Sequence, residues 1–276
     1  MSGGAPVDVA TVLCQWSAGG LAFLWITTRR REVGLGYGWL VRSIYMTIAA
    51  VGAATGLVFQ PNGVRDAACI AMAVAAAAAL VRSTLRSPPA ASSADEPGPA
   101  FDPRGVRSVD GFDPRWDLPG PLLGAVGVVA AALASPGDVV TILHLARLLA
   151  GAAFLGVVTD AMLLGHWYLV QPGLRREPLR ALVRHLASVW PIEVGLLLIP
   201  TGMGSVLSGS IDDGYGGLLG WFWATCAITT IALAGVTVAA LREREYAAVM
   251  AATGLLYLAI LTGFGTDLVA RLTLVS

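Results

Sequence analysis

Eight apolar stretches, each long enough to cross a lipid bilayer, constrain this chain more than any other feature of its sequence. A transmembrane helix needs roughly 20 predominantly apolar residues. Two of the stretches are weaker than the rest, since one is short and alanine-rich and another begins with prolines, which a helix tolerates in its first turn. The chain is therefore predicted to be all-α, a polytopic integral membrane bundle of eight transmembrane helices. The predicted spans are Val7–Thr27, Tyr37–Phe59, Ala67–Val81, Leu118–Ser135, Val139–Val170, Leu182–Val206, Gly217–Leu241 and Tyr246–Leu268.

The composition agrees with this prediction. Of the 276 residues, 56% are hydrophobic and only 13% are charged, whereas a soluble domain carries about 25% charged residues. Much of the surface must face lipid, so the lipid bilayer is the first expected partner. The formal net charge is zero, which argues against nucleic acid as a partner. The sequence contains no lysine, which excludes a Walker-type phosphate loop, a retinal Schiff base and a pyridoxal enzyme, because each requires one.

The cysteines and the N-terminus give weaker information. Cys14, Cys69 and Cys226 are isolated, with no CxxC or CxxCH spacing, so neither an iron–sulfur cluster nor an attached c-type haem is supported. Cys14 and Cys69 are both expected near the outer face, where a disulfide is the alternative to buried thiols. The N-terminus lacks a basic region and a small-residue cleavage site, so no removable signal peptide is predicted.

The arginines predict the orientation of the bundle. Arginine in short loops marks the cytoplasmic side of a membrane protein. Of the 18 arginines, 15 lie in or beside the odd-numbered connections between the predicted spans. The even-numbered connections carry mainly aspartates, and Arg65 is the only loop arginine among them. We therefore expect the chain in a bacterial inner (plasma) membrane, with both termini on the outer face.

One long polar segment divides the predicted helices into three and five. Residues 1–85 hold the first three, residues 86–117 form a flexible cytoplasmic linker rich in Pro, Ala, Ser and Asp, and residues 118–276 hold the last five. Phe-Asp-Pro-Arg occurs twice in the linker, at Phe101–Arg104 and at Phe112–Arg115. The repeat is either a docking motif for a protein partner in a membrane complex or an accidental duplication in a low-complexity loop.

All three histidines fall in the fifth and sixth predicted helices. His144 and His166 are 22 residues apart in the fifth, about 33 Å at 1.5 Å per residue, so they lie near opposite faces of the membrane. An antiparallel hairpin would bring His166 and His185 to nearly the same depth. There the pair is a candidate for the axial ligands of a b-type haem, the one metal site suggested by the sequence, or for hydrogen bonds to a quinone.

The neighbours of these histidines leave the assignment open. Arg180 and Arg184 precede or flank His185 and would hold haem propionates. His144 has no second histidine at its depth, and Met203 is its one candidate partner. The alternative is an interfacial belt, because Gly165-His166-Trp167-Tyr168 carries the amphipathic rings that are enriched where a helix meets the headgroups.

Two carboxyl groups at membrane depth are the sharper candidates, since ionisable groups there are costly and mark function. Glu193 lies near the middle of the predicted sixth helix, two residues after Pro191, and Asp160 lies about two turns inward of the centre of the fifth. A carboxyl in hydrocarbon can stay protonated at pH 7, which suits a proton relay or a group that accepts protons from a quinol. The alternative is a packing carboxyl that is protonated or hydrogen-bonded, or one that is neutralised by Arg147 or Arg42.

Spacing predicts two further contacts. Asp267 and Arg271 are four residues apart near the end of the last span and are expected to pair at the outer interface. Gly52 and Gly56 have the spacing that lets two helix backbones approach closely.

Three functions follow from these residues. The leading one is an integral subunit of a bacterial redox complex, in which the fifth and sixth helices contact a quinone or haem b while Glu193 and Asp160 carry protons. The second is a proton-coupled transporter or channel that uses the same carboxyls without a cofactor. The third is a structural or assembly subunit with no site of its own. Because no nucleophile elbow, zinc-protease helix or phosphate loop is present, no enzyme class is predicted.

Overall fold

The computed structural model describes residues 8–85, 113–134, 138–171, 174–199, 202–243 and 245–274. The secondary structure of these residues is entirely helical, and it contains eight spans long and apolar enough to cross a membrane, which confirms the predicted helical membrane bundle. The 3₁₀ turn η1 and helix α4 together form the fourth span. The elements are α1 Val9–Thr28, α2 Leu35–Phe59, α3 Gly63–Leu85, η1 Pro114–Asp117, α4 Pro119–Leu133, α5 Asp138–Val170, α6 Glu177–Leu198, α7 Met203–Leu207, α8 Leu218–Ala240 and α9 Tyr246–Leu274.

The sixth span differs from its prediction at both ends. The predicted span was Leu182–Val206, whereas α6 runs from Glu177 to Leu198. Met203 begins the separate short helix α7. Ile199 has extended backbone angles (φ −113°, ψ 150°), the conformation that a residue before a proline favours. Glu193 therefore lies in the last two turns of α6 instead of at its middle.

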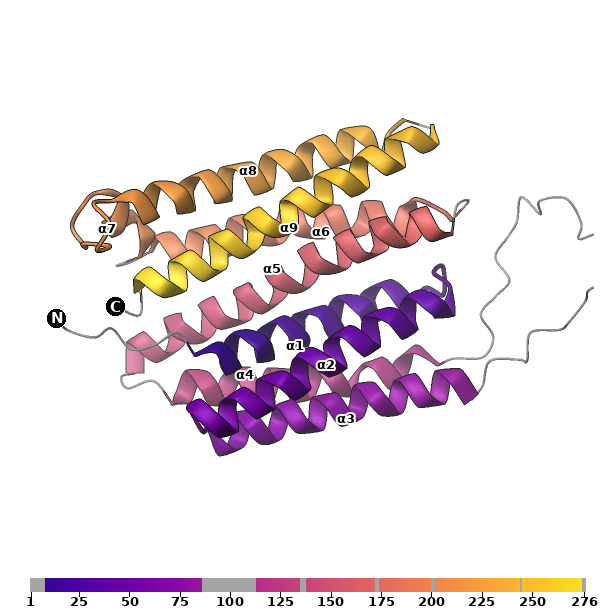
Figure 1. Ribbon diagram of the computed structural model, residues 1–276, viewed down its shortest axis with the longest axis horizontal. Helices are drawn as coiled ribbons and strands as arrows, with labels where there is room; N and C mark the ends of the chain where they lie inside the picture. The colour runs from indigo at the N-terminus through magenta and orange to yellow at the C-terminus, as the bar shows by residue number, and fades with distance from the viewer. Residues whose placement is uncertain are drawn as a thin grey trace, which may run out of the picture.

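Helices α1 and α5 form the interior of the bundle. The most apolar window of α5 is 72% buried and that of α1 is 67% buried, whereas the windows of the other six spans are 28–39% buried. Figure 1 shows α2, α3 and α4 on one side of this pair and α6, α8 and α9 on the other. The two groups of helices are thus joined mainly through the contact between α1 and α5.

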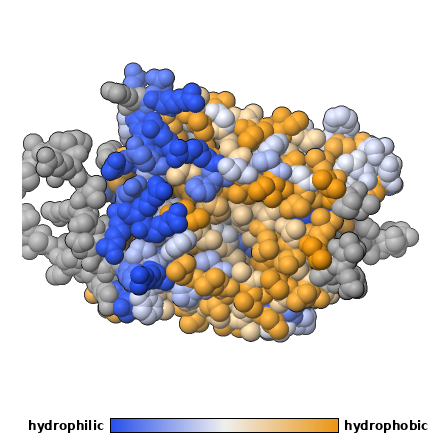
Figure 2. All heavy atoms as spheres, turned by 180° about the vertical axis from the view of Figure 1, so that it is seen from behind, coloured by the Kyte–Doolittle hydropathy of each residue, from blue (hydrophilic) through white to orange (hydrophobic). Residues whose placement is uncertain are grey.

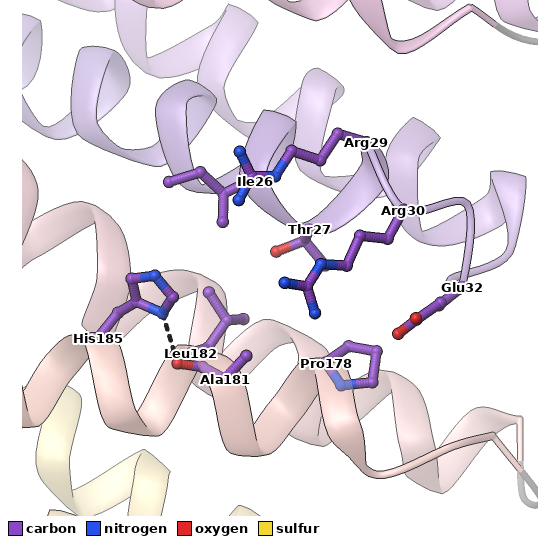
Figure 3. Close-up of a pocket in the computed structure, with 9 residues that line it drawn as sticks. All are labelled: Ile26, Thr27, Arg29, Arg30, Glu32, Pro178, Ala181, Leu182 and His185. Atoms are coloured by element: carbon purple, nitrogen blue, oxygen red, sulfur yellow. Dashed lines mark hydrogen bonds between the residues drawn. The ribbon is translucent and has the colours of Figure 1, made fainter.

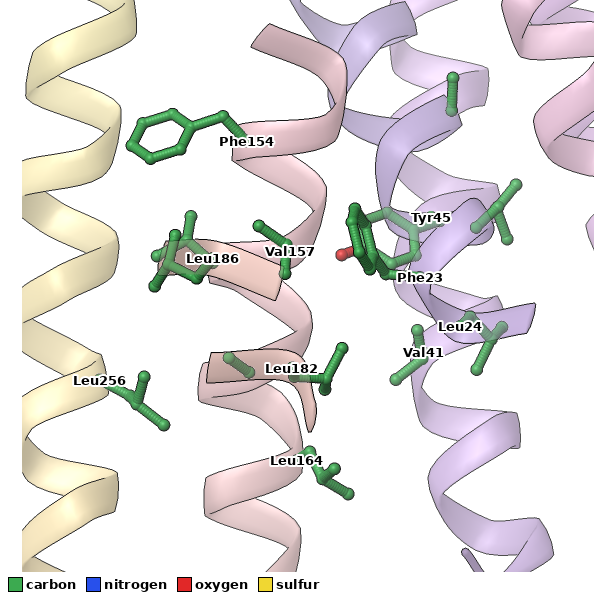
Figure 4. Close-up of a cluster of buried hydrophobic side chains, with 14 of the residues drawn as sticks. Phe23, Leu24, Val41, Tyr45, Phe154, Val157, Leu164, Leu182, Leu186 and Leu256 are labelled. Carbon is green, nitrogen blue, oxygen red and sulfur yellow. The ribbon is translucent and has the colours of Figure 1, made fainter. Parts of the chain in front are cut away.

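The hydrophobic core surrounds α5 (Figure 4). Phe154 and Val157 of α5 are fully buried, as are Leu186 of α6, Tyr45 of α2 and Leu256 of α9. In a membrane, apolar side chains gain little by leaving lipid for protein, so close packing has to hold such helices together.

That close packing is tightest where α1 crosses α5. A Cβ atom at Gly19 would lie 1.7 Å from the carbonyl oxygen of Ala152, and a Cβ atom at Gly156 would lie 2.2 Å from the carbonyl carbon of Gly19. The next residue, Gly20, leaves room for the ring of Tyr45, whose Cζ would lie 1.8 Å from an added Cβ. The backbones of the two central helices therefore touch directly.

Hydrophilic residues form a belt at one end of the bundle (Figure 2), and we call this the basic end. It is the end where α3 finishes and η1 begins, whereas α1 begins and α9 finishes at the opposite end (Figure 1). Ten described arginines lie in the turns and helix termini of the basic end. They are Arg29, Arg30, Arg31, Arg82, Arg115, Arg175, Arg176, Arg180, Arg184 and Arg242.

The chain re-enters the bundle at the basic end through η1. Asp113 caps this turn by accepting a hydrogen bond from the backbone N–H of Arg115 (3.0 Å), and Pro114 occupies the first position of the turn. These three residues belong to the second Phe-Asp-Pro-Arg sequence. Its Phe112 and the whole first copy lie outside the described residues, as does most of the predicted linker.

A buried ion pair fixes η1 to α2. Arg42 donates from Nε to Asp117 Oδ1 (2.7 Å) and from Nη2 to Asp117 Oδ2 (2.8 Å), and both side chains are 1% exposed. The hydroxyl of Thr28 donates to the same carboxylate (3.1 Å). A bidentate pair of this kind satisfies both charges away from water, so Arg42 neutralises Asp117 rather than Asp160.

The α1–α5 crossing predicts a specific sensitivity to added volume. We expect Gly156→Ala to lower the free energy of unfolding by about 1–3 kcal/mol or more, because the new methyl group overlaps the backbone of Gly19. Gly254→Ala in α9 is the matched control, since an added Cβ there meets nothing within 4 Å. Thermal unfolding in detergent measures both, and equal melting temperatures for the two variants would contradict the crossing.

Candidate functional site

Glu193 is a buried carboxyl at the end opposite the basic end. Its side chain is fully buried, and within the part of the chain that the structure describes its hydrogen-bond contact is with another carboxyl, that of Asp267. The charged groups that act on it are Asp267 and Arg271 of α9 and Arg147 of α5. A carboxyl from α6 thus faces a carboxyl and a guanidinium from α9.

The two α9 residues form the predicted ion pair. Arg271 donates from Nε to Asp267 Oδ2 (2.7 Å) and from Nη2 to Asp267 Oδ1 (2.8 Å), with side chains 14% and 1% exposed. The pairing of residues four apart in sequence is confirmed, but the pair is more deeply buried than an interfacial position implies. Arg271 donates to both oxygens of Asp267, and Glu193 contacts the same carboxyl from α6.

Helices α1 and α5 complete the surroundings of the ion pair. A Cβ atom at Gly151 of α5 would lie 2.8 Å from Arg271 Nη2 and from Asp267 Oδ1, and 3.2 Å from Gln15 Nε2. The glycine therefore makes room for polar side chains from both α1 and α9. Gln15 is fully buried and donates to the backbone carbonyl of Leu148, while its Oε1 has no partner among the described residues. The sequence analysis missed Gln15, although an amide inside an apolar span is a detectable signal.

The cluster of Gln15, Glu193, Asp267 and Arg271 contains two carboxyl groups but only one cation. Asp267 and Arg271 neutralise one another. An ionised Glu193 would add a second negative charge beside Asp267 in a medium of low dielectric constant, without a hydrogen bond to offset its lost hydration. A protonated Glu193 leaves one carboxylate for one guanidinium, so the arrangement favours a carboxyl that holds a proton.

Arg147 donates its hydrogen bonds to backbone carbonyls of α6 and not to the carboxyl of Glu193. Its Nε donates to the carbonyl of Leu196 (2.9 Å) and its Nη2 to the carbonyl of Ile199 (2.8 Å). These are carbonyls of the last turn of α6, which lack partners within the helix. Arg147 therefore caps α6 and fixes the end of the helix that carries Glu193.

The neighbouring His144 is half-buried on α5. Met203, its predicted partner, lies in α7, where its sulfur accepts a hydrogen bond from the hydroxyl of Thr273 (3.0 Å).

Asp160 occupies a second, separate position within the bundle. It is fully buried, and its Oδ1 accepts a hydrogen bond from the hydroxyl of Tyr45 (2.6 Å), while Oδ2 has no partner among the described residues. The hydroxyl of Tyr37 approaches the backbone carbonyl of Asp160 (3.4 Å). Gly151, the residue of α5 that borders the Asp267–Arg271 pair, lies nine residues before Asp160, about 14 Å along the helix. The structure therefore does not bring Asp160 and Glu193 into one site.

The histidines predicted as haem ligands contact different helices. His166 is exposed, and its Nδ1 lies 3.0 Å from the hydroxyl of Tyr257 on α9. His185 packs its ring edge against Phe23 of α1, with ring centroids 5.9 Å apart. The side chain of Arg184 is exposed.

Haem and quinone binding therefore remain predictions. Within the described ranges no three His, Cys, Asp or Glu side chains gather as a metal site. An absorption spectrum of purified protein before and after dithionite, with His166→Ala and His185→Ala for comparison, tests the haem prediction directly.

The cysteines contribute no covalent link to this end of the bundle. Cys14, Cys69 and Cys226 are free and buried. The thiols of Cys14 on α1 and Cys69 on α3 contact one another, as their predicted common depth requires.

Comparison with protein families, with curated proteins and with solved structures finds no match to this chain.

The buried ion pair predicts that removing one partner destabilises the protein and that removing both partners restores most of the loss. We expect Arg271→Met to lower the free energy of unfolding by about 3–5 kcal/mol, because it leaves Asp267 buried beside Glu193 without a cation. Combining it with Asp267→Asn should restore most of the loss, since no uncompensated charge remains. Chemical unfolding in detergent measures both variants. Additive losses in the double variant would contradict the pairing.

Proposed function

We propose that this protein is a multi-pass membrane protein that moves protons, as a proton-coupled transporter or channel in which Glu193 binds and releases the proton. The observation that carries this proposal is the state of Glu193. It is a fully buried carboxyl whose hydrogen-bond contact among the described residues is another carboxyl, that of Asp267, which is already paired with arginine. Ionisable groups at membrane depth are retained at such cost mainly where they take part in transport or proton transfer.

The helix that carries Glu193 supports reversible proton binding. Pro191 lies inside α6 two residues before Glu193, and a proline removes one backbone hydrogen bond and permits a bend. Arg147 holds the last carbonyls of the same helix. A bend at Pro191 would change the distance between Glu193 and the Asp267–Arg271 pair, so the charge of Glu193 and the shape of α6 depend on each other.

Asp160 is proposed as a second proton-carrying group nearer the basic end. Its hydrogen bond to Tyr45 leaves one carboxyl oxygen without a described partner. The stretch of α5 between the two acids is lined by the buried apolar side chains of Phe154, Val157 and Val158. Protons cannot cross such packing without water or a rearrangement. This favours a transporter that changes conformation over a permanently open proton wire.

The proposed setting is a bacterial plasma membrane, with the basic end in the cytoplasm and both termini outside. Its support is the gathering of arginine at one end of the bundle (Figure 2), the distribution that marks the cytoplasmic side of membrane proteins. A protein partner in a membrane complex is proposed only for the Phe-Asp-Pro-Arg repeat.

Proton flux into proteoliposomes tests the proposal. With an internal pH dye and a potassium gradient clamped by valinomycin, vesicles with the wild-type chain should acidify faster than empty vesicles. Glu193→Gln should reduce this rate to that of empty vesicles, because glutamine keeps the shape of a protonated glutamate and cannot release the proton.

Glu177→Gln is the matched control, because Glu177 lies on the same helix but is exposed. Its flux should equal that of the wild type. An unchanged flux in Glu193→Gln, with a melting temperature no lower than that of the wild type, would contradict the proposal.

A further inference from the structure

A groove lies between α1 and α6 at the basic end (Figure 3). Both helices pack extensively against α5 but make little contact with each other, and the groove fills the gap that remains. It lies at the end of α6 where the helix begins, whereas Glu193 lies where the helix finishes. The groove is therefore separate from the proposed proton site.

The charged side chains of the groove follow one another toward its aqueous end. In Figure 3 the guanidinium of Arg30 lies between α1 and α6, and the carboxylate of Glu32 lies beyond it, near Pro178. Neither Arg30 nor Glu32 forms an ion pair with any residue that the structure describes. Arg29 is engaged differently, because its guanidinium lies over the ring of Trp25, 5.1 Å from the centroid. The groove thus has two arginines in its lining, of which Arg30 points between the helices, and, further out, one carboxylate.

The part of the groove nearer the membrane interior is mostly apolar. Ile26 of α1 and Leu182 of α6 line it, together with His185. The Nδ1 of His185 donates to the carbonyl of Ala181 (2.6 Å), because a carbonyl can only accept, and this leaves Nε2 available to a ligand. The most apolar window of α6 is only 28% buried, so acyl chains can run along this helix.

We propose that the groove binds a zwitterionic phospholipid with a primary-amine headgroup, that is, one with phosphoethanolamine chemistry. Such a lipid carries its groups in the order that the groove does: acyl chains, then phosphate, then ammonium. Arg30 would donate charge-assisted hydrogen bonds to the phosphate, and the ammonium would donate to Glu32. Basic pockets between helices at the cytoplasmic side are recurrent headgroup sites, and here Glu32 supplies the selectivity.

Lipid titration of the full chain in nonionic detergent, followed by native mass spectrometry, tests this site. The probes are phosphatidylethanolamine, phosphatidylglycerol, phosphatidylcholine and inorganic phosphate. The wild type should bind phosphatidylethanolamine most tightly, and Arg30→Gln should weaken all three lipids about tenfold through the lost phosphate contact. Glu32→Gln should remove the preference for the amine headgroup without weakening phosphatidylglycerol. Arg242→Gln, an exposed arginine of the same end, should change nothing.

Three results would overturn the proposal. One is tighter binding of phosphatidylglycerol than of phosphatidylethanolamine by the wild type. Another is an amine preference that persists in Glu32→Gln. The third is displacement of the lipid by inorganic phosphate at equal concentration, which would assign Arg30 to a free anion. Because Arg30 is exposed and Glu32 is partly exposed, neither substitution disturbs the core, and the elution volume of each variant in size-exclusion chromatography verifies this.

Discussion

The direct contact between the backbones of α1 and α5 is the constraint on which the rest of the bundle depends. Gly19 and Gly156 leave no space for even a methyl group between the two helices. In lipid, apolar side chains gain little by leaving the solvent, so close backbone approach and dispersion have to supply the association. Every other span packs against one or both of these helices or against a helix that does. The polar groups of the interior, Gln15 on α1 and Asp160 on α5, are positioned by the same crossing.

The buried charged side chains of the interior are paired with opposite charges, whereas two buried carboxyls, Glu193 and Asp160, are not. Arg42 binds Asp117, and Arg271 binds Asp267, each through two hydrogen bonds. Glu193 has no such partner within the described residues, and Asp160 has only the hydroxyl of Tyr45. A pair of fixed charges contributes little to function, because it cannot change state without a large cost. The two carboxyls without counter-ions are the groups that can change state, which is why the proposed proton chemistry rests on them.

The sequence predicted the eight spans because hydropathy and length are properties of single segments. It also predicted the pairing of Asp267 with Arg271, since residues four apart on one helix are neighbours whatever surrounds them. It did not predict that Glu193 faces Asp267, that Arg42 reaches Asp117, or that Gly19 meets Gly156. Each of these contacts depends on how one helix is rotated and shifted against another. Helices whose apolar residues surround them completely carry no stripe that fixes this rotation. The glycines that were expected to matter, Gly52 and Gly56, do lie in contacts, Gly52 against α1 and Gly56 against Asp66 of α3.

Pro191 divides α6 into two segments. The segment before Pro191 lines the groove at the basic end, and the segment after it carries Glu193. If the helix bends at Pro191, occupancy of the groove and protonation of Glu193 are thermodynamically linked, and each shifts the other by the same coupling free energy. The lipid composition of one leaflet would then set the proton affinity at the opposite face of the membrane.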